Sequence, residues 1–203
     1  MNTLTKDIVI CTANPGKIKE FKQIIELNPD IKVNFKAIAD MVEDFDPEET
    51  GTSFLENSLI KAQAGAKLTS SYCIADDSGV EISALDKKPG IYSKRYLAAK
   101  ENGVLDVLEE LKDAKDRSCR YVCSIVLVDA QGNKIFETQN YWEGEVGFKA
   151  QGSNGFGFDP IVHPNENPDL TVAQLEPQEK SRLSHRAKAM AQLVNFLKNM
   201  DIV

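Results

Sequence analysis

The segment from Thr12 to Lys17 places polar and charged residues between an apolar run and an amphipathic stretch. Its six residues are Thr12, Ala13, Asn14, Pro15, Gly16 and Lys17. If a helix begins here, its free N–H groups and positive dipole end favour an anion. Thr12 and Asn14 can donate hydrogen bonds, and Lys17 can place an ammonium on a phosphate. The segment therefore predicts a phosphate-binding turn. The Walker pattern is absent, and an ordinary turn with a capping Thr or Asn fits as well.

Two pairs of acidic residues could hold a divalent cation. Glu48 and Glu49 lie in an acidic loop, and Asp76 and Asp77 directly follow the apolar run Tyr72–Ala75. Mg²⁺ prefers oxygen ligands and usually takes one or two carboxylates together with substrate phosphates. The first pair also fits a solvated loop, and the second also fits an Asx turn, because a Ser-Gly pair follows it. Two acids beside an apolar strand are costly to desolvate without a partner, which keeps a functional role open.

A glycine-rich segment, Ser153–Pro160, combines two aromatic residues with an aspartate. Glycines let the backbone approach a ligand, and the rings of Phe156 and Phe158 can stack on a base. Asp159 can accept N–H bonds from a ligand. An equally good interpretation is a turn whose phenylalanines cover the core.

The segment Glu179–Arg186 gathers Lys180, Arg182 and Arg186 at the expected start of the last helix. Cations are poorly placed there for the helix dipole, so a bound anion or nearby acids would explain them. A solvated basic face is the common alternative for such a run. His185 taken alone is more often structural than catalytic, and His163, before a proline, is expected in a surface loop.

Strands and helices must position these residues, and they alternate early in the chain. The predicted strands are Ile8–Cys11, Ile31–Ala37, Tyr72–Ala75, Val80–Ile82 and a hairpin of Tyr121–Val128 with Ile135–Trp142. The predicted helices are Lys17–Glu26, one that starts near Ser53 with a Ser53/Glu56 capping box, Tyr96–Lys112 with a break near Asn102, and Ser181 or Ser184 to Met200. This order predicts an α/β protein with a mixed sheet.

The composition is that of a globular protein, with 203 residues, 42% hydrophobic and 27% charged. The length fits one large domain or two closely packed lobes. The net charge of −7 argues against broad nucleic-acid binding, yet it permits a small anionic substrate in a local cationic pocket. No apolar run approaches the roughly 20 residues of a membrane helix and no signal segment is visible, so we expect no membrane association and a cytoplasmic location.

The four cysteines lie in apolar or strand-like runs without a CxxC motif; they are Cys11, Cys73, Cys119 and Cys123. The chain has only 2 histidines, which makes a zinc site a poor interpretation. We therefore expect buried, reduced thiols.

Taken together, six blocks of the sequence resemble the inosine triphosphate pyrophosphatase family, which hydrolyses dITP, ITP and XTP. The blocks are Thr12–Lys17, Glu48–Gly51 with Phe54–Asn57, Ala75–Gly79, Pro89–Tyr96, Gly155–Pro160, and Glu179–Ser181 with Ser184–Arg186. Each block is weak alone, but the ordered set spans nearly the whole chain and is specific. The segment Asp129–Trp142 matches only loosely.

The resemblance implies an elongated α/β fold with a long mixed β-sheet flanked by helices, two lobes and a central active-site cleft. It treats residues 1–203 as one two-lobed domain and implies a homodimer. It assigns Asp77 as general base and Mg²⁺ ligand, and Glu49 as a second metal ligand with Glu48 as its substitute. The implied substrate contacts are Thr12, Ala13, Asn14, Pro15, Gly16, Lys17 and Ser78 for the triphosphate, and Phe156, Gly157, Phe158, Asp159, Lys180, His185 and Arg186 for the nucleotide. Many relatives have tyrosine where this chain has Phe158, so any hydrogen bond from a hydroxyl is lost there.

The implied activity is Mg²⁺-dependent hydrolysis of a nonstandard purine nucleoside triphosphate to the monophosphate and pyrophosphate. Two other classes of function stay open. A nucleotide-binding sensor without turnover could dispense with the acidic pairs, and their presence favours the enzyme. A sugar-phosphate phosphatase would release inorganic phosphate first and would show no preference for a base.

Overall fold

The structure, a computed structural model, describes residues 6–29, 31 and 33–199. Its strands are β1 (Lys6–Ile10), β2 (Val33–Ala37), β3 (Tyr72–Ile82), β4 (Lys88–Gly90), β5 (Ser118–Val128), β6 (Lys134–Val146) and β7 (Val162–Pro164). Its α-helices are α1 (Pro15–Glu26), α2 (Phe54–Thr69), α3 (Ser93–Ala98), α4 (Val104–Glu110), α5 (Pro177–Leu183) and α6 (His185–Asn199). Lys32 of the predicted second strand and Met200 of the predicted last helix lie outside the described residues, as do Asp30 and the side chain of Ile24.

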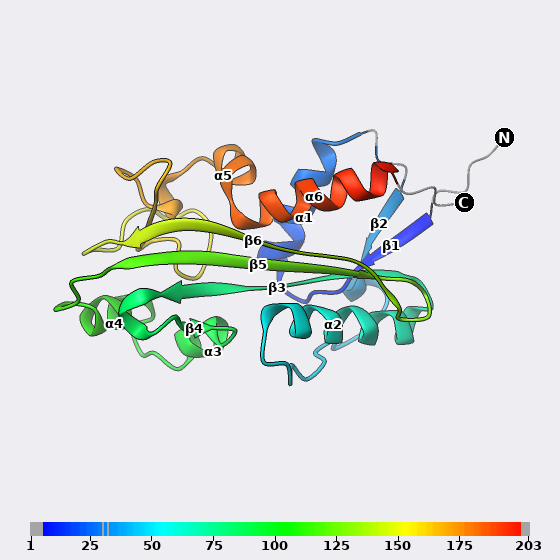
Figure 1. The fold of residues 1–203 in the computed structure, drawn as a ribbon, viewed down its shortest axis with the longest axis horizontal. Helices are drawn as coiled ribbons and strands as arrows, with labels where there is room; N and C mark the ends of the chain where they lie inside the picture. The colour runs from blue at the N-terminus through cyan, green and yellow to red at the C-terminus, as the bar shows by residue number, and fades with distance from the viewer. Residues whose placement is uncertain (1–5, 30, 32, 200–203) are drawn as a thin grey trace. The chain divides into compact units, whose positions relative to one another are not determined.

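The strands form one mixed sheet in the order β2-β1-β3-β5-β6-β7, with β4 paired to β3 (Figure 1). β1 runs parallel to β2 and β3, whereas β4 and β7 run antiparallel to β3 and β6. Parallel pairs at one end and antiparallel pairs at the other confirm the predicted α/β class with a mixed sheet. The predicted elongated shape and central cleft stay predictions.

The chain divides into two compact units. The first comprises Met1–Asp77, Ser124–Gln139 and Lys188–Val203, and the second comprises Ser78–Cys123 and Asn140–Ala187. β3, β5 and β6 therefore each contribute residues to both units. In the first unit α1 and α6 lie on one face of the sheet and α2 lies on the other (Figure 1). Along β3 the chain passes from the first unit to the second between Asp77 and Ser78.

The core of the first unit lies where α2 packs against the sheet, and small side chains bring them close. Ala62 and Ala66 of α2 are buried with Cys11 and Cys73 of the strands. A Cβ on Gly65 would lie 2.2 Å from the Cys11 Sγ and 3.1 Å from the Cys73 Sγ. All four cysteines are buried and free, which confirms the prediction of reduced thiols.

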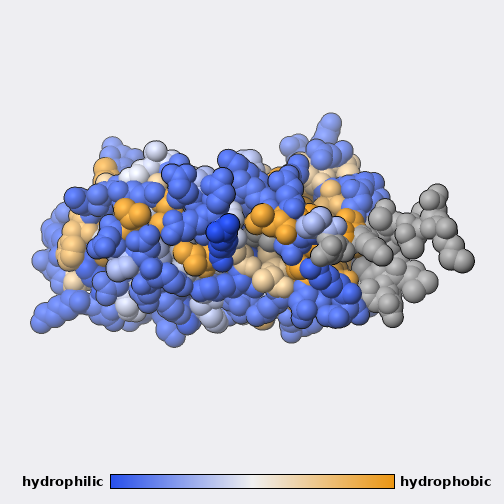
Figure 2. Space-filling model, turned by 90° about the horizontal axis from the view of Figure 1, so that it is seen from above, coloured by the Kyte–Doolittle hydropathy of each residue, from blue (hydrophilic) through white to orange (hydrophobic). Residues whose placement is uncertain are grey.

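The core of the second unit contains large aromatic residues. Its buried members include Tyr121, Trp142 and Phe158, together with Cys119 of β5 and aliphatic residues of β3, β6 and α4. Figure 2 shows one face of the molecule, where hydrophobic side chains appear as small separate patches among hydrophilic ones. Within the described residues, every helix is too short or too polar to cross a membrane.

Two predictions of secondary structure are wrong. β3 does not break at Asp76–Gly79 but continues to Ile82, because the two carboxylates meet lysines inside the fold and need no turn. His163 lies in β7, paired with Glu145 of β6, and not in a loop. The last helix, by contrast, begins at His185, directly after Ser184, which is one of the two starts that the sequence allowed; the extended backbone of Ser184 (ψ 157°) separates it from α5.

Other predictions hold with shifted ends. The hairpin of β5 and β6 is confirmed around the turn at Asp129–Asn133. Ser53 caps α2 by accepting the Glu56 N–H at 3.2 Å, as the capping box requires. In a capping box the Glu56 carboxylate would accept the backbone N–H of the cap residue, Ser53. Here it accepts the backbone N–H and the hydroxyl of the preceding residue, Thr52.

Gly65→Ala should destabilise the protein, because the added methyl group has no room between two sulfur atoms. Alanine normally favours a helix over glycine by about 1 kcal/mol, but overpacking a core costs about 1–3 kcal/mol. We expect a net loss of about 1 kcal/mol in the free energy of unfolding, measured with urea. Lys67→Ala on the exposed side of α2 is the control and should change stability by no more than about 0.5 kcal/mol. A variant as stable as the wild type would contradict the close packing.

Candidate active site

The turn before α1 is held by its own side chains. The Asn14 Oδ1 accepts the N–H groups of Gly16 at 2.9 Å and Lys17 at 3.3 Å, and so caps the helix. The Thr12 Oγ1 accepts the Asn14 N–H at 3.2 Å. Pro15 follows the cap, where its missing N–H costs nothing, so α1 begins at Pro15 and not at Lys17. The capped turn that the sequence allowed is confirmed, and Ala13 and Pro15 are exposed on it.

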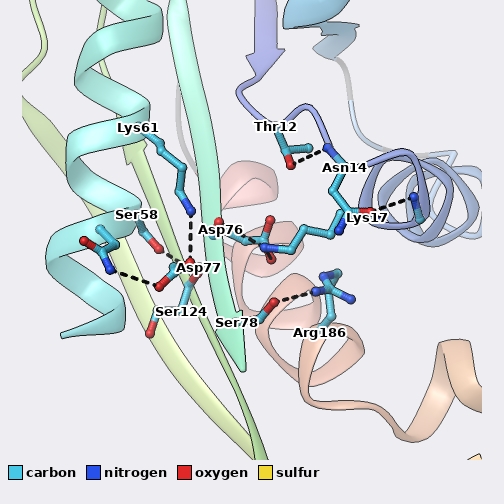
Figure 3. A network of polar contacts seen from close by, with 12 residues as sticks. Thr12, Asn14, Lys17, Ser58, Lys61, Asp76, Asp77, Ser78, Ser124 and Arg186 are labelled. Atoms are coloured by element: carbon cyan, nitrogen blue, oxygen red, sulfur yellow. Dashed lines mark hydrogen bonds and ion pairs between the residues drawn. The ribbon is translucent and has the colours of Figure 1, made fainter. Parts of the chain in front are cut away.

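Asp76 and Asp77 are adjacent on β3, so their side chains point to opposite faces of the sheet. Lys17 reaches Asp76 from α1, with 2.9 Å between its Nζ and the Asp76 Oδ2 (Figure 3). Lys61 reaches Asp77 from α2, with 3.0 Å between its Nζ and the Asp77 Oδ1 (Figure 3). The Asp76 side chain is fully buried and that of Asp77 is 8% exposed. Each buried carboxylate therefore has a lysine from a different helix, one from each face.

Glu49 joins the same cluster through Lys61. The Lys61 Nζ lies 2.6 Å from the Glu49 Oε1, so one ammonium bridges Glu49 and Asp77. Glu48 is exposed, whereas Glu49 is half-buried. The geometry thus places Glu49, and not Glu48, on the lysine that also binds Asp77; its role as a metal ligand stays a prediction.

Asn57 links the Asp77 carboxylate to the loop that carries Glu49. Its Nδ2 lies 3.4 Å from the Asp77 Oδ2, and its Oδ1 accepts the Gly51 N–H at 2.9 Å. A Cβ on Gly51 would lie 2.6 Å from that Oδ1, so only glycine lets the loop approach this closely. Asn57 is 2% exposed, and removing its amide would leave buried groups unpaired.

The charges in this cluster shift two pKa values. Burial raises the pKa of the Asp77 carboxyl above its usual 3.8; Lys61 and Lys17 oppose that shift, and Glu49 adds to it. Burial lowers the pKa of the Lys61 ammonium, but the charges of Asp77, Asp76 and Glu49 outweigh this and raise it above 10.5. Lys61 therefore stays cationic, and Asp77 accepts a proton more readily than an exposed aspartate. A carboxylate with a raised pKa is suited to act as a general base.

A metal ion would have two carboxylates in this cluster. In the part of the chain that the structure describes, no three His, Cys, Asp or Glu side chains form a group that could hold one. Asp77 and Glu49 nonetheless converge on one cation, the Lys61 ammonium. Two carboxylates completed by phosphate oxygens form a usual Mg²⁺ environment, so this donor set fits the predicted ion.

In the second unit, Asp159 is the centre of a network of hydrogen bonds. Its Oδ1 accepts the Tyr121 hydroxyl at 2.9 Å, and its Oδ2 accepts the Lys180 Nζ and the Phe156 N–H, both at 2.8 Å. Asp159 is 2% exposed. A Cβ on Gly155 would lie 2.0 Å from the Oδ2, so the loop can approach the carboxylate only with glycine there. The nearby acid that could explain Lys180 is therefore Asp159.

The two phenylalanines of the glycine-rich segment differ in exposure. Phe156 is 40% exposed, and the Lys180 Nζ lies 4.8 Å from the centre of its ring. Phe158 is 4% exposed and belongs to the core of the second unit. Gly157, between them, has φ +63°, which favours glycine. For Phe158 the structure gives the core position that the sequence left open, and Phe156 keeps an accessible ring.

His185 and Arg186 begin α6 and are both buried. The His185 ring stacks on Tyr121, with 4.9 Å between ring centres and an angle of 14° between planes. Arg186 is 1% exposed, and its Nη2 donates to the Ser78 Oγ at 3.0 Å (Figure 3). Arg182, by contrast, is exposed. Ser78 directly follows Asp77 along β3. Lys61 binds Asp77 and Arg186 binds Ser78, so two consecutive residues of the strand each contact a cation.

Sequence reasoning missed Asn57, Lys61 and Tyr121 in these networks, and it missed Trp142, whose ring centre lies 5.8 Å from that of Tyr121. The buried positions of α2 recur at helical spacing, and Asn57 and Lys61 interrupt an otherwise small or apolar stripe. Polar residues on a stripe that faces the sheet were the available signal. Tyr121 and Trp142 gave none, since aromatic residues in strands are usual core residues.

The pH dependence of stability should change in Asp77→Asn. Because its pKa is raised, the protonated Asp77 stabilises the fold; this contribution is complete below the unfolded value near 3.8 and is lost as pH rises through the folded pKa. Asparagine does not titrate, so the stability of the variant relative to the wild type should rise with pH from about pH 4. Urea unfolding at a series of pH values in EDTA measures this. The exposed Asp46→Asn is the control, and a pH-independent difference would contradict the shift.

Known proteins match the chain over nearly its full length. Residues 8–196 match the Ham1 family. A dITP/XTP pyrophosphatase of Staphylococcus aureus is 40% identical over 196 residues, which cover 95% of this chain and 96% of the relative. A dITP/XTP pyrophosphatase of Shewanella oneidensis is 37% identical over 207 residues, covering 97% and 96%. The structure of a HAM1 protein from Coxiella burnetii has a TM-score of 0.85 and 35% identity, and covers 97% of this chain and 100% of that chain. These matches confirm the resemblance inferred from the six sequence blocks, and the chain belongs to the Ham1 family.

Proposed function

We propose that this protein is a nucleoside triphosphate pyrophosphatase that hydrolyses dITP, ITP and XTP to the nucleoside monophosphate and pyrophosphate. The observation that carries the proposal is the buried cluster of Asp76 and Asp77 with Lys17 and Lys61. The names of its relatives in Staphylococcus aureus and Shewanella oneidensis support the substrate class. An enzyme of this kind removes nonstandard purine nucleotides from the nucleotide pool.

In this proposal the first unit handles the triphosphate. The positive dipole end of α1 and the Lys17 ammonium offer positive charge to phosphate oxygens, with Thr12 and Asn14 as further contacts. Ser78, which directly follows Asp77 on β3, is another proposed contact. Lys61 adds a second ammonium beside Asp77. Because both lysines are held by buried acids, their charges are oriented before the substrate binds. Such preorganised charge is the main source of catalysis in phosphoryl transfer.

Asp77 acts as the general base. Its carboxylate accepts a proton from a water molecule, whose oxygen forms a bond to the α-phosphorus. The bond between that phosphorus and the bridging oxygen breaks, and pyrophosphate leaves with the bonding electron pair. Lys61 and Asn57 each contact one carboxylate oxygen of Asp77, which orients the group for this role.

Mg²⁺ is the cofactor in this proposal, and Asp77 and Glu49 would hold it. When bound, such an ion neutralises charge on the phosphate oxygens and on the departing pyrophosphate. The chain itself brings two carboxylates from distant segments to one point. The Lys61 Nζ lies at this point, 2.6 Å from the Glu49 Oε1 and 3.0 Å from the Asp77 Oδ1.

Recognition of the base would come from the second unit. Hypoxanthine and xanthine carry a 6-oxo acceptor and an N1–H donor, whereas adenine carries a 6-amino group and a bare N1. A donor from His185 or Arg186 that points at the 6-oxo group would face another donor in adenine. Each unpaired buried polar group costs about 1–3 kcal/mol, so two mismatches give strong discrimination. Phe156, with its accessible ring, is the residue placed to stack on the base.

The proposal also includes a homodimer in the cytoplasm, as the resemblance to the pyrophosphatase family implies. Light scattering after gel filtration would measure the mass of the assembly.

A panel of nucleotides tests the function directly. With Mg²⁺, dITP, ITP and XTP should release pyrophosphate as the first product, and kcat/KM for dITP should exceed that for dATP about 100-fold or more. Pyrophosphate and inorganic phosphate are read out separately. Equal values for dITP and dATP would reject the account of base recognition. Inorganic phosphate as the first product would identify a phosphatase, and binding without turnover would identify a sensor.

Asp77→Asn should lower kcat by about 10²–10⁴-fold, because the amide cannot accept the proton from water. The dissociation constant for dITP should change far less, since Lys17 and the start of α1 remain. Stopped assays for pyrophosphate give kcat, and calorimetry gives the dissociation constant. Asp46→Asn, an exposed acid in the loop before Glu49, is the control and should keep wild-type turnover. Near-normal turnover of the Asp77 variant would reject its role as the base.

A further inference from the structure

We propose that Tyr121 is a positioning residue for purine recognition. Its hydroxyl acts through Asp159 on Lys180 and on the backbone of Phe156. The proposal rests on the proposed function for the identity of the ligand, a 6-oxopurine nucleotide. All the groups involved belong to the second unit. Neither the resemblance nor the comparisons assign Tyr121 a role.

The hydroxyl determines how the Asp159 carboxylate is oriented. Tyr121 is 6% exposed on β5, and its Oη donates to the Asp159 Oδ1 at 2.9 Å. The other oxygen, Oδ2, accepts the Lys180 Nζ and the Phe156 N–H, both at 2.8 Å. With one oxygen held by Tyr121, the carboxylate cannot turn about its Cβ–Cγ bond without losing a buried hydrogen bond. Tyr121 on β5 therefore fixes the position of the second oxygen, and with it the position of the two donors to that oxygen.

The two donors are the groups expected to meet the base. The Lys180 Nζ lies 4.8 Å from the centre of the Phe156 ring, so a shift of Asp159 moves an ammonium and an aromatic face together. The Phe156 backbone is flanked by Gly155 and Gly157, with φ of +75° and +63°, and belongs to no helix or strand. The Phe156 backbone is tied to Asp159 twice, because its carbonyl also accepts the Asp159 N–H at 3.3 Å, so a shift of Asp159 is passed on to Phe156.

The ring of Tyr121 lies next to His185, another residue predicted to contact the base. It stacks on His185 at 4.9 Å between ring centres, and Trp142 lies 5.8 Å from Tyr121 and 6.4 Å from His185. Phenylalanine at position 121 would keep this stack and remove only the hydroxyl. Tyr121→Phe therefore removes the bond to Asp159 while preserving the core.

The test compares Tyr121→Phe with Tyr96→Phe. Tyr96 also donates its hydroxyl to a carboxylate, that of Glu110, but it lies in α3 and Glu110 is not one of the proposed site residues. We expect Tyr121→Phe to raise KM for dITP with kcat changed less than about threefold. It should also lower the ratio of kcat/KM for dITP over dATP by about tenfold, the effect of one buried hydrogen bond of about 1.4 kcal/mol. Tyr96→Phe should leave both quantities at wild-type values.

A second measurement needs no ligand. The Phe156 N–H donates to Asp159, so its exchange with deuterium should become about tenfold faster in Tyr121→Phe and stay unchanged in Tyr96→Phe. Wild-type exchange at Phe156 in Tyr121→Phe would overturn the proposal. Faster exchange with an unchanged dITP/dATP ratio would also overturn it, because the hydroxyl would then be only structural.

These measurements separate this inference from the proposed function. If the wild-type protein releases no pyrophosphate from dITP, the proposed function fails. Binding of dIMP then replaces the kinetic ratio, with dAMP as the comparison and the fluorescence of Trp142, the 1 tryptophan of the chain, as the signal. A loss of preference for dIMP in Tyr121→Phe supports the role of Tyr121. Equal preference in variant and wild type, or the absence of any preference in the wild type, rejects it.

Discussion

Two adjacent carboxylates inside a β-sheet are the constraint on which the first unit depends. Asp76 and Asp77 are 1% and 6% exposed, and burying an ionised carboxylate without a partner costs several kcal/mol. Alternation along β3 sends them to opposite faces, so one cation cannot serve both. The fold meets this with one lysine from α1 and one from α2. The positions of the start of α1 and of the buried face of α2 therefore depend on Asp76 and Asp77.

This arrangement explains why the groups suited to phosphate chemistry occur together. Lys17 needs the Asn14 cap to start its helix where it can reach Asp76. Lys61 needs the buried face of α2, which packs closely because Gly65 has no side chain. Glu49 reaches Lys61 from a loop whose Gly51 is held by Asn57. The features that hold the unit together therefore also set the charge pattern that a polyphosphate and its cation would meet.

The sequence predicted local features well and long-range ones poorly. The Asn14 cap and the hairpin depend on neighbouring residues, and both are confirmed. The break in β3 was predicted from Asp-Asp-Ser-Gly, a usual turn sequence, and is wrong because lysines 59 and 16 residues away stabilise the extended chain. Lys61 and Tyr121 could not be assigned, since their partners Asp77 and Asp159 are close only in the folded unit. The candidate site was recognised from family motifs, but the residues that support those motifs become visible only in three dimensions.

The three donors to Asp159 come from a strand, a loop and a helix that are far apart in sequence. A loop without its own secondary structure usually opens at low free energy, independently of its surroundings. Here, opening residues 155–159 would pull a buried carboxylate away from Lys180 and Tyr121 and break two buried hydrogen bonds at once. The loop and α5 should consequently unfold as one cooperative segment. A local fluctuation would then rarely open the loop without also opening α5.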